Sequence, residues 1–156
     1  MEWFNVERLD VERLLAEWRW LCPDNVQLIA RSAFADLFLR NESGQVFRLD
    51  VAIGKLSKVA DSEAELRALA GTREKREEWF AETDEKAAAG RGLVPAPTQC
   101  IVFGVPLVFA ESGSPQTPYI VDVYEHISFR GDLNRQISSL PDGSKVRLQV
   151  KPLTSS

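Results

Sequence analysis

The sequence is poor in the residues that most often bind metals and act as nucleophiles. It contains one histidine, His126, and two cysteines, Cys22 and Cys100. Structural zinc sites take four His or Cys ligands, so this inventory excludes a histidine- or cysteine-rich metal site. A catalytic thiol needs a nearby base, and His126 with either cysteine is the one Cys–His pair that the chain offers. Cys22 stands beside Pro23 and Cys100 lies inside an apolar run, so we interpret all three side chains as structural.

Other motifs of chemistry are also absent. The chain has no calcium-binding Asp-x-Asp-x-Asp-Gly loop, and Gly90-Arg91-Gly92 follows an expected helix, whereas a phosphate-binding loop precedes one. Asp36, Asp50 and Asp122 lie on or beside expected strands and leave a carboxylate-dependent enzyme open as an alternative. Such residues more often protect strand edges or cap loops. We expect no enzyme activity, no cofactor and no metal.

The chain also lacks a cationic excess. It has 19 Lys and Arg against 23 Asp and Glu, a formal net charge of -4 and a pI of about 5.1. A protein that binds nucleic acid usually presents a basic stripe to the phosphates. The densest cationic segment, residues 73–78, alternates in sign, which is typical of a solvated helix face. We therefore expect no nucleic-acid partner.

No hydrophobic run approaches the roughly 20 residues that a membrane-spanning helix needs. The first residues are acidic and their apolar positions are interrupted by charges, which does not resemble a signal peptide. These features predict a cytoplasmic protein with no membrane partner. Both thiols are then expected to be reduced and buried.

What the chain does have suits a folded domain of ordinary size. Its 156 residues are 44% hydrophobic and 27% charged, which is typical of one globular domain with its own core. We expect a single α+β domain over residues 1–151 and a frayed tail over 152–156. The oligomeric state stays open.

Alternation of polar and apolar residues predicts an antiparallel meander in the first half of the chain. The expected strands cover residues 26–32, 36–40, 45–50 and 55–59, and the small polar residues 41–44 form a hairpin turn. Further extended segments are expected over 98–110, 119–124 and 145–150. With them, the fold class is α+β, with one antiparallel sheet of about five to seven strands and helices packed on it.

Helical spacing of apolar residues predicts the remaining elements. The expected helices cover residues 9–21, 61–71, 72–89 and 127–140, the first with Asp10 as its N-cap and the last ending before a Pro141–Gly143 turn. Trp18 and Trp79 are expected in the core. Trp3, Phe4 and Trp20 form an apolar group near the N-terminus that we expect to be core, with partial exposure as the alternative.

Short motifs in the chain resemble a bacterial family named for the C-terminal domain of a type VI secretion DNase-immunity protein. They are Ala33-Phe34-Ala35-Asp36 before a strand, Leu49-Asp50 and Gly54-Lys55-Leu56, and then a helix opened by Ser62 and Glu63. Val121-Asp122 and Leu140-Pro141-Asp142-Gly143 resemble the family's closing region. The similarity spans roughly residues 10–148. Ala35 stands where the family usually has glycine, and the N-terminal domain of the founding members has no counterpart here.

The resemblance implies an immunity protein that binds a co-encoded toxin, such as a nuclease, and covers its active site. The partner is then a cognate protein toxin. A general interaction domain of the same fold is the alternative. Acidic and polar loops are the expected docking surface, because nucleases are often basic around the active site. The candidate partner-binding residues are Asn41, Glu42, Asp50, Asp61, Glu63 and Glu111, with Asp50 and Asp61 expected to form one acidic corner.

Overall fold

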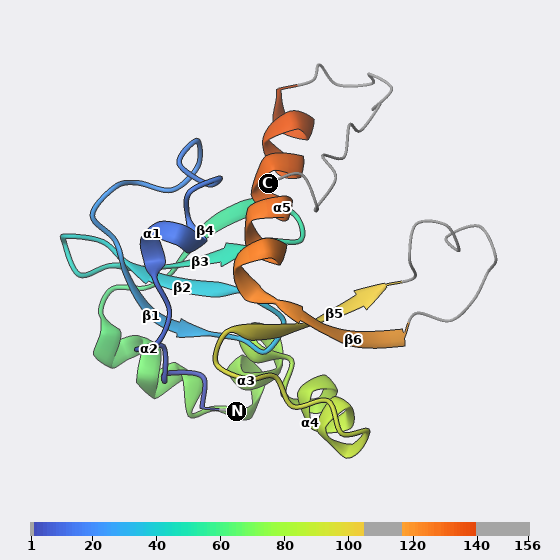
Figure 1. Ribbon diagram of the computed structural model, residues 1–156. Coiled ribbons are helices and arrows are strands. Elements are labelled where there is room, and N and C mark those ends of the chain that lie inside the picture. Colours follow the sequence, from blue (N-terminus) through green and yellow to red (C-terminus); the bar gives the residue numbers. More distant parts are fainter. Residues whose placement is uncertain (1, 105–116, 140–156) are drawn as a thin grey trace.

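A computed structural model describes residues 2–104 and 117–139 of the chain. The predicted α+β class is confirmed: helices and antiparallel strands pack around a shared core (Figure 1). The strands are β1 (Gln27–Arg31), β2 (Leu37–Arg40), β3 (Val46–Asp50), β4 (Lys55–Ala60), β5 (Gln99–Gly104) and β6 (Thr117–Asp122). The helices are α1 (Val11–Leu14), α2 (Glu63–Ala70), α3 (Arg73–Phe80), α4 (Glu82–Gly90) and α5 (Val123–Ser138).

The predicted meander is confirmed as a four-stranded antiparallel sheet in the order β1-β2-β3-β4. Leu37 pairs with Leu49 and Leu49 with Leu56, so these leucines point to one face of the sheet. Phe38 pairs with Arg48 and Arg48 with Ser57, which places these three on the other face. Cross-strand partners share a face because side chains alternate along every strand.

The expected single sheet of five to seven strands is wrong among the described residues. β5 and β6 pair only with each other and form a separate ribbon. The ribbon is joined to the sheet by a hydrogen bond from the Ile101 N–H to the Ala33 carbonyl (2.8 Å). The buried Arg31 guanidinium adds bonds to the Pro97 and Gln99 carbonyls. Local alternation predicts strands but not which strands pair, so the sequence did not separate the two sheets.

The first face of the four-stranded sheet packs against α1, α5 and the ribbon, and we call it the α5 face. Trp18, 0% exposed, lies at its centre, and its indole N–H donates to the Ile127 carbonyl of α5 (2.8 Å). At the β3–β4 turn, the Asn134 side-chain amide donates to the Val51 carbonyl (3.0 Å). The core of this face contains Leu14, Leu15, Cys22, Leu37, Leu39, Leu49, Cys100, Val123 and Ile127.

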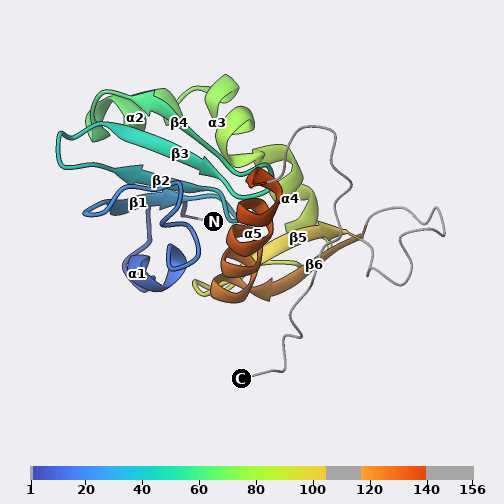
Figure 2. The same ribbon diagram turned by 90° about the horizontal axis from the view of Figure 1, so that it is seen from above.

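The opposite face packs against α2 and α3, and we call it the α2–α3 face (Figure 2). Its core is aromatic: Phe38 lies 5.1 Å from Phe80 and 5.7 Å from Trp79, measured between ring centroids. Trp3 stacks on Phe80 at 4.2 Å and Phe4 packs nearby. Trp20 instead stacks on Trp18 and is 36% exposed. The N-terminal aromatic group is thus divided between the two faces and is partly exposed: Trp3 and Phe4 are partly buried against the core, and Trp20 is exposed.

Two predicted helices are shorter than expected. The helix expected over 9–21 is only α1, and the chain then continues through turns that still bring Leu15, Trp18 and Cys22 into the core. The helix expected over 72–89 is broken at Ala81, whose φ of 48° is left-handed. The Glu77 carboxylate stabilises the break by accepting from the Thr83 N–H (2.7 Å) and hydroxyl (2.6 Å). Apolar spacing does not detect such a reversal, because helical spacing resumes immediately after it.

Several predictions fall outside the described residues. They are the strand over 145–150, the Pro141–Gly143 turn, the tail over 152–156 and most of the loop over 111–118. Within residues 2–104 and 117–139, no helix is long and apolar enough to cross a membrane.

Candidate functional site

Most of the predicted docking residues lie at one end of the four-stranded sheet. Asn41 and Glu42 form the β2–β3 turn, and Asp61 and Glu63 follow β4 at the same end, because Ala60 pairs with Val46. The Arg40 guanidinium lies 3.8 Å from the Glu63 carboxylate and connects the hairpin to α2. We call this region, with Asp24, Glu42, Asp61 and Glu63, the acidic end of the sheet.

Asp50 lies at the opposite end. It pairs with Lys55 where β4 begins, and its Oδ1 accepts from the Ala52 (3.0 Å) and Ile53 (3.3 Å) N–H groups of the β3–β4 turn. The length of β4 therefore separates Asp50 from Asp61 by roughly 20 Å, at about 3.3 Å per residue. The two aspartates do not form the acidic corner that the sequence suggested. Glu111 lies outside the described residues.

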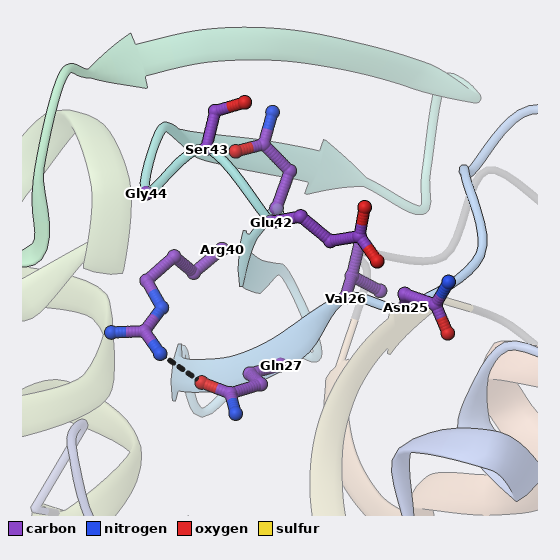
Figure 3. A pocket seen from close by; sticks show the side chains of 8 residues that line it. Asn25, Val26, Gln27, Arg40, Glu42, Ser43 and Gly44 are labelled. Carbon is purple, nitrogen blue, oxygen red and sulfur yellow. Dashed lines mark hydrogen bonds between the residues drawn. The ribbon is translucent and has the colours of Figure 1, made fainter.

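The acidic end contains an open hollow of about 630 Å³ (Figure 3). The Arg40 guanidinium donates to the Gln27 side-chain carbonyl along one side of it, and the Glu42 side chain extends over the other (Figure 3). Six of its eight lining residues have polar side chains, and the other two are Val26 and Gly44. The polar residues are Asn25, Gln27, Arg40, Asn41, Glu42 and Ser43. A hollow rich in amides and hydroxyls is suited to hydrogen bonding at an interface.

Local sequence explains the shape of this hollow. The Asn41 side chain accepts from the Gln45 N–H (2.9 Å), and Gly44 adopts a φ of 85° that favours glycine. Sequence reasoning found Asn41 and Glu42 but missed Asn25, Gln27 and Arg40. Gln27 and Arg40 stand near the ends of two expected strands and are brought together by β1–β2 pairing, which the sequence did not specify residue by residue.

The carboxylates of the acidic end are accessible. The side chains of Asp24, Asp61 and Glu63 are 86%, 70% and 38% exposed, and Glu42 is also exposed. Their ion pairs, such as Lys58 with Asp61 at 2.5 Å, are surface pairs. Such pairs contribute little to stability, so a toxin cation can compete with Lys58 for the Asp61 carboxylate.

A second polar region lies on the α2–α3 face, beyond the part that the two helices cover. The Arg48 guanidinium donates to the Asp36 carboxylate at 2.8 Å, with both side chains mostly buried. Burial raises the pKa of Asp36 to about 6, although Arg48 and the Val51 N–H act in the opposite direction. Nearby Asp50 raises it further. Arg48 Nε is buried without a hydrogen-bond partner among the described residues.

Next to this pair is a cavity of about 400 Å³ between the sheet and α3, which we call the cationic pocket. Its charged lining comprises four cations, Arg48, Lys55, Lys58 and Lys75, and two acids, Asp50 and Glu78. Ser57 adds a hydroxyl, and Ile53, Val59 and Trp79 provide apolar walls. Of the three aspartates considered for catalysis, Asp36 and Asp50 are neighbours here. Asp122 instead caps α5 by accepting from the Glu125 N–H (3.0 Å).

The cysteines and the histidine do not form a reactive group. Burial raises the pKa of Cys22 to about 11 and of Cys100 to about 12, which disfavours a thiolate. Burial, assisted by Arg130, lowers the pKa of His126 to about 4. No hydrogen bond joins His126 to either thiol within the described part of the chain. In the same residues, no three His, Cys, Asp or Glu side chains are placed to hold a metal ion.

Searches of protein-family models, of curated proteins and of solved structures returned no match to this chain. The resemblance to the immunity family therefore depends on the sequence motifs alone.

Proposed function

We propose that this protein is an immunity protein that binds a co-encoded bacterial toxin in the cytoplasm and covers its active site. The acidic end of the sheet is the docking surface in this proposal, with the hollow beside Glu42 receiving a projecting part of the toxin. The partner is a protein rather than a nucleic acid or a membrane.

The observation that carries the proposal is the group of exposed carboxylates at one end of the sheet, of which Glu42 lines the open hollow. Asp24, Glu42 and the Asp61–Glu63 pair come from three separate segments of the chain, yet they surround the same end of the sheet. Complementary charge accelerates association and selects against wrong partners. A toxin with a basic active-site surface, such as a nuclease, matches this arrangement. The sequence motifs of the immunity family favour the same function.

The required affinity is compatible with a surface of this kind. An immunity protein must hold its toxin stoichiometrically, which needs nanomolar binding or about -12 kcal/mol. A standard interface of about 1,600 Å² reaches this value when a few anchors are well packed. The charges of the acidic end raise the association rate and orient the toxin. Packed side chains around the hollow lower the dissociation rate of the complex.

Co-expression tests the function. A bacterial host producing the toxin encoded beside this gene should survive when it also makes this protein. Unchanged killing, or a neighbouring gene whose product is not toxic, would contradict toxin neutralisation. Binding without protection would instead favour a general interaction domain.

A charge-matched pair of variants tests the surface. Glu42→Gln combined with Asp61→Asn should slow association with that toxin by about tenfold at low salt. Glu74→Gln combined with Glu125→Gln removes the same charge from α3 and α5 and should leave association nearly unchanged. Stopped-flow kinetics at two salt concentrations provides the measurement. Equal slowing by both double variants would contradict docking at the acidic end.

A further inference from the structure

The cationic pocket has features of a ligand site that toxin binding does not use. It lies along β4, from Lys55 to Val59, and is completed by β3, the β3–β4 turn and α3. Its lining contains four cations and two acids, and two further carboxylates, those of Asp36 and Asp61, bind Arg48 and Lys58 from beside it. The donors that these ion pairs leave free decide what the pocket can bind.

Two hydrogen-bond donors in the pocket, the Lys55 ammonium and the Arg48 Nε–H, have no partner among the described residues. The ammonium groups of Lys58 and Lys75 are bound to Asp61 (2.5 Å) and Glu78 (2.6 Å). Lys55, in contrast, has no ion pair among the described residues and is exposed. Arg48 uses one terminal nitrogen on Asp36, while its buried Nε has no partner in the described part of the chain.

The pairing of β3 with β4 places the Arg48, Ser57 and Lys55 side chains on the same face of the sheet. Arg48 is paired with Ser57 and Asp50 with Lys55, so Arg48, Ser57 and Lys55 lie on one face of two adjacent strands. The Asp50 carboxylate is held in its own turn by the Ala52 and Ile53 N–H groups. A guanidinium, an ammonium and a hydroxyl therefore line the same cavity.

We propose that the cationic pocket binds the phosphate group of a small phosphomonoester. A phosphate monoester presents a charge close to −2 and three acceptor oxygens, which matches three donors of different geometry. Charge-assisted hydrogen bonds from Arg and Lys are the strong ones in such a site. The inference does not rest on toxin neutralisation, because its donors Arg48, Lys55 and Ser57 are not among the residues proposed to dock the toxin.

The remaining lining indicates a ligand with an apolar body. Ile53, 65% exposed, stands at the rim, and Val59 and Trp79 form walls of the same cavity. Trp79 is only 3% exposed and its ring already faces the Lys75 ammonium at 5.3 Å. The ligand body is thus expected to contact Ile53 and Val59 rather than to stack on Trp79. A volume of about 400 Å³ is near the lower limit of small-molecule sites.

Titration of the full chain with inorganic phosphate, phenyl phosphate and phenol tests the proposal. Amide signals of Ser57 and Ile53, followed by NMR, should shift saturably with both phosphates, and phenyl phosphate should bind more tightly than inorganic phosphate. Phenol alone should cause no saturable shift. Absence of saturable shifts with either phosphate would overturn the proposal. Tighter binding of a 5′-phosphorylated single-stranded oligonucleotide than of phenyl phosphate would also overturn it, because the pocket would then serve a nucleic acid.

Variants locate the site. Lys55→Gln should weaken phenyl phosphate binding by about threefold, and Lys55→Gln with Lys75→Gln by about tenfold, as expected for one and two exposed charge pairs. Lys86→Gln removes a cation whose side chain is 76% exposed on α4, away from the pocket, and should leave binding unchanged. Thermal melting of each variant verifies the fold. Unaltered affinity in the folded double variant would exclude the cationic pocket as the site.

Discussion

The two faces of the four-stranded sheet differ in how completely they are covered. The α5 face is apolar along β2 and β3, where Leu37, Leu39 and Leu49 pack under α1 and α5. On the α2–α3 face, Phe38 packs against Trp79 and Phe80, but its cross-strand partner Arg48 belongs to a polar region with Asp36. In the described residues the α5 face is therefore mainly apolar core, whereas the α2–α3 face combines core with a polar cavity.

The comparison shows that short helices can stabilise one part of a sheet face and leave another part accessible. Helices α2 and α3 are each eight residues long, or about 12 Å at 1.5 Å per residue. They cover the half of the face that contains Phe38 and leave the part around Arg48 and Lys55 open. The buried charges in this open part cost stability, and the apolar packing of the other face offsets that cost.

The largest expected effect comes from the covered half of the α2–α3 face. Phe38→Ala removes a ring that is 0% exposed and contacts two aromatic neighbours. It should lower the free energy of unfolding by about 3–5 kcal/mol. Ser57→Ala in the open half should change it by less than about 0.5 kcal/mol. Urea denaturation followed by tryptophan fluorescence measures both, and similar losses would contradict the division of this face into core and cavity.

The next effect is a pH dependence from Asp36. Its pKa is about 6 in the folded chain and 3.8 ordinarily, so the folded state gains a proton that the unfolded state lacks as the pH falls from 7 to 4. Asp36 therefore stabilises the fold progressively over that range, by about 3 kcal/mol at most, and this contribution is lost again as the pH rises through 6.

The variant Asp36→Asn isolates this contribution. The unfolding free energy of the natural chain minus that of the variant should increase as the pH is lowered from 7 to 4, and should level off below about 3.8. The difference cancels the titration of the other carboxylates. A difference that stays constant with pH would show that Asp36 is not the buried titrating group.

The smallest effect tests the loop that connects β1 to β2. Ala35 is 0% exposed and has a φ of 76°, in the left-handed region that favours glycine. Ala35→Gly should therefore raise the unfolding free energy by about 1 kcal/mol. Ala33→Gly, at a buried position without positive φ, is the control and should lower it by a similar amount. Destabilisation by both variants would contradict strain at Ala35.

The strained Ala35 also explains a feature of the sequence. The immunity family that the chain resembles usually has glycine at this position, and the left-handed backbone here is the physical reason why glycine fits. The sequence identified the position as a departure from the pattern. Only the φ angle of Ala35 shows that replacing it with glycine should stabilise the fold.

Local chemistry made the hairpin and helix-cap predictions succeed. Alternation from 45 to 50, a turn at Asn41–Gly44 and the N-cap Asp10 each depend on neighbours in the chain, and all three are in the structure. The predicted acidic corner of Asp50 and Asp61 was wrong because it depended on tertiary structure rather than on neighbours in the chain. Asp50 and Asp61 are close in sequence, yet a straight strand between them holds them at opposite ends of the sheet.

The sequence by itself determined the α+β class and the meander over β1–β4, because both follow from residue spacing. Only the tertiary structure decided that β5 and β6 form a separate ribbon, that Gln27 joins Arg40 at the acidic end, and that Arg48, Lys55 and Lys75 line one pocket. These arrangements depend on strand pairing and helix length, which bring together residues that the chain keeps apart.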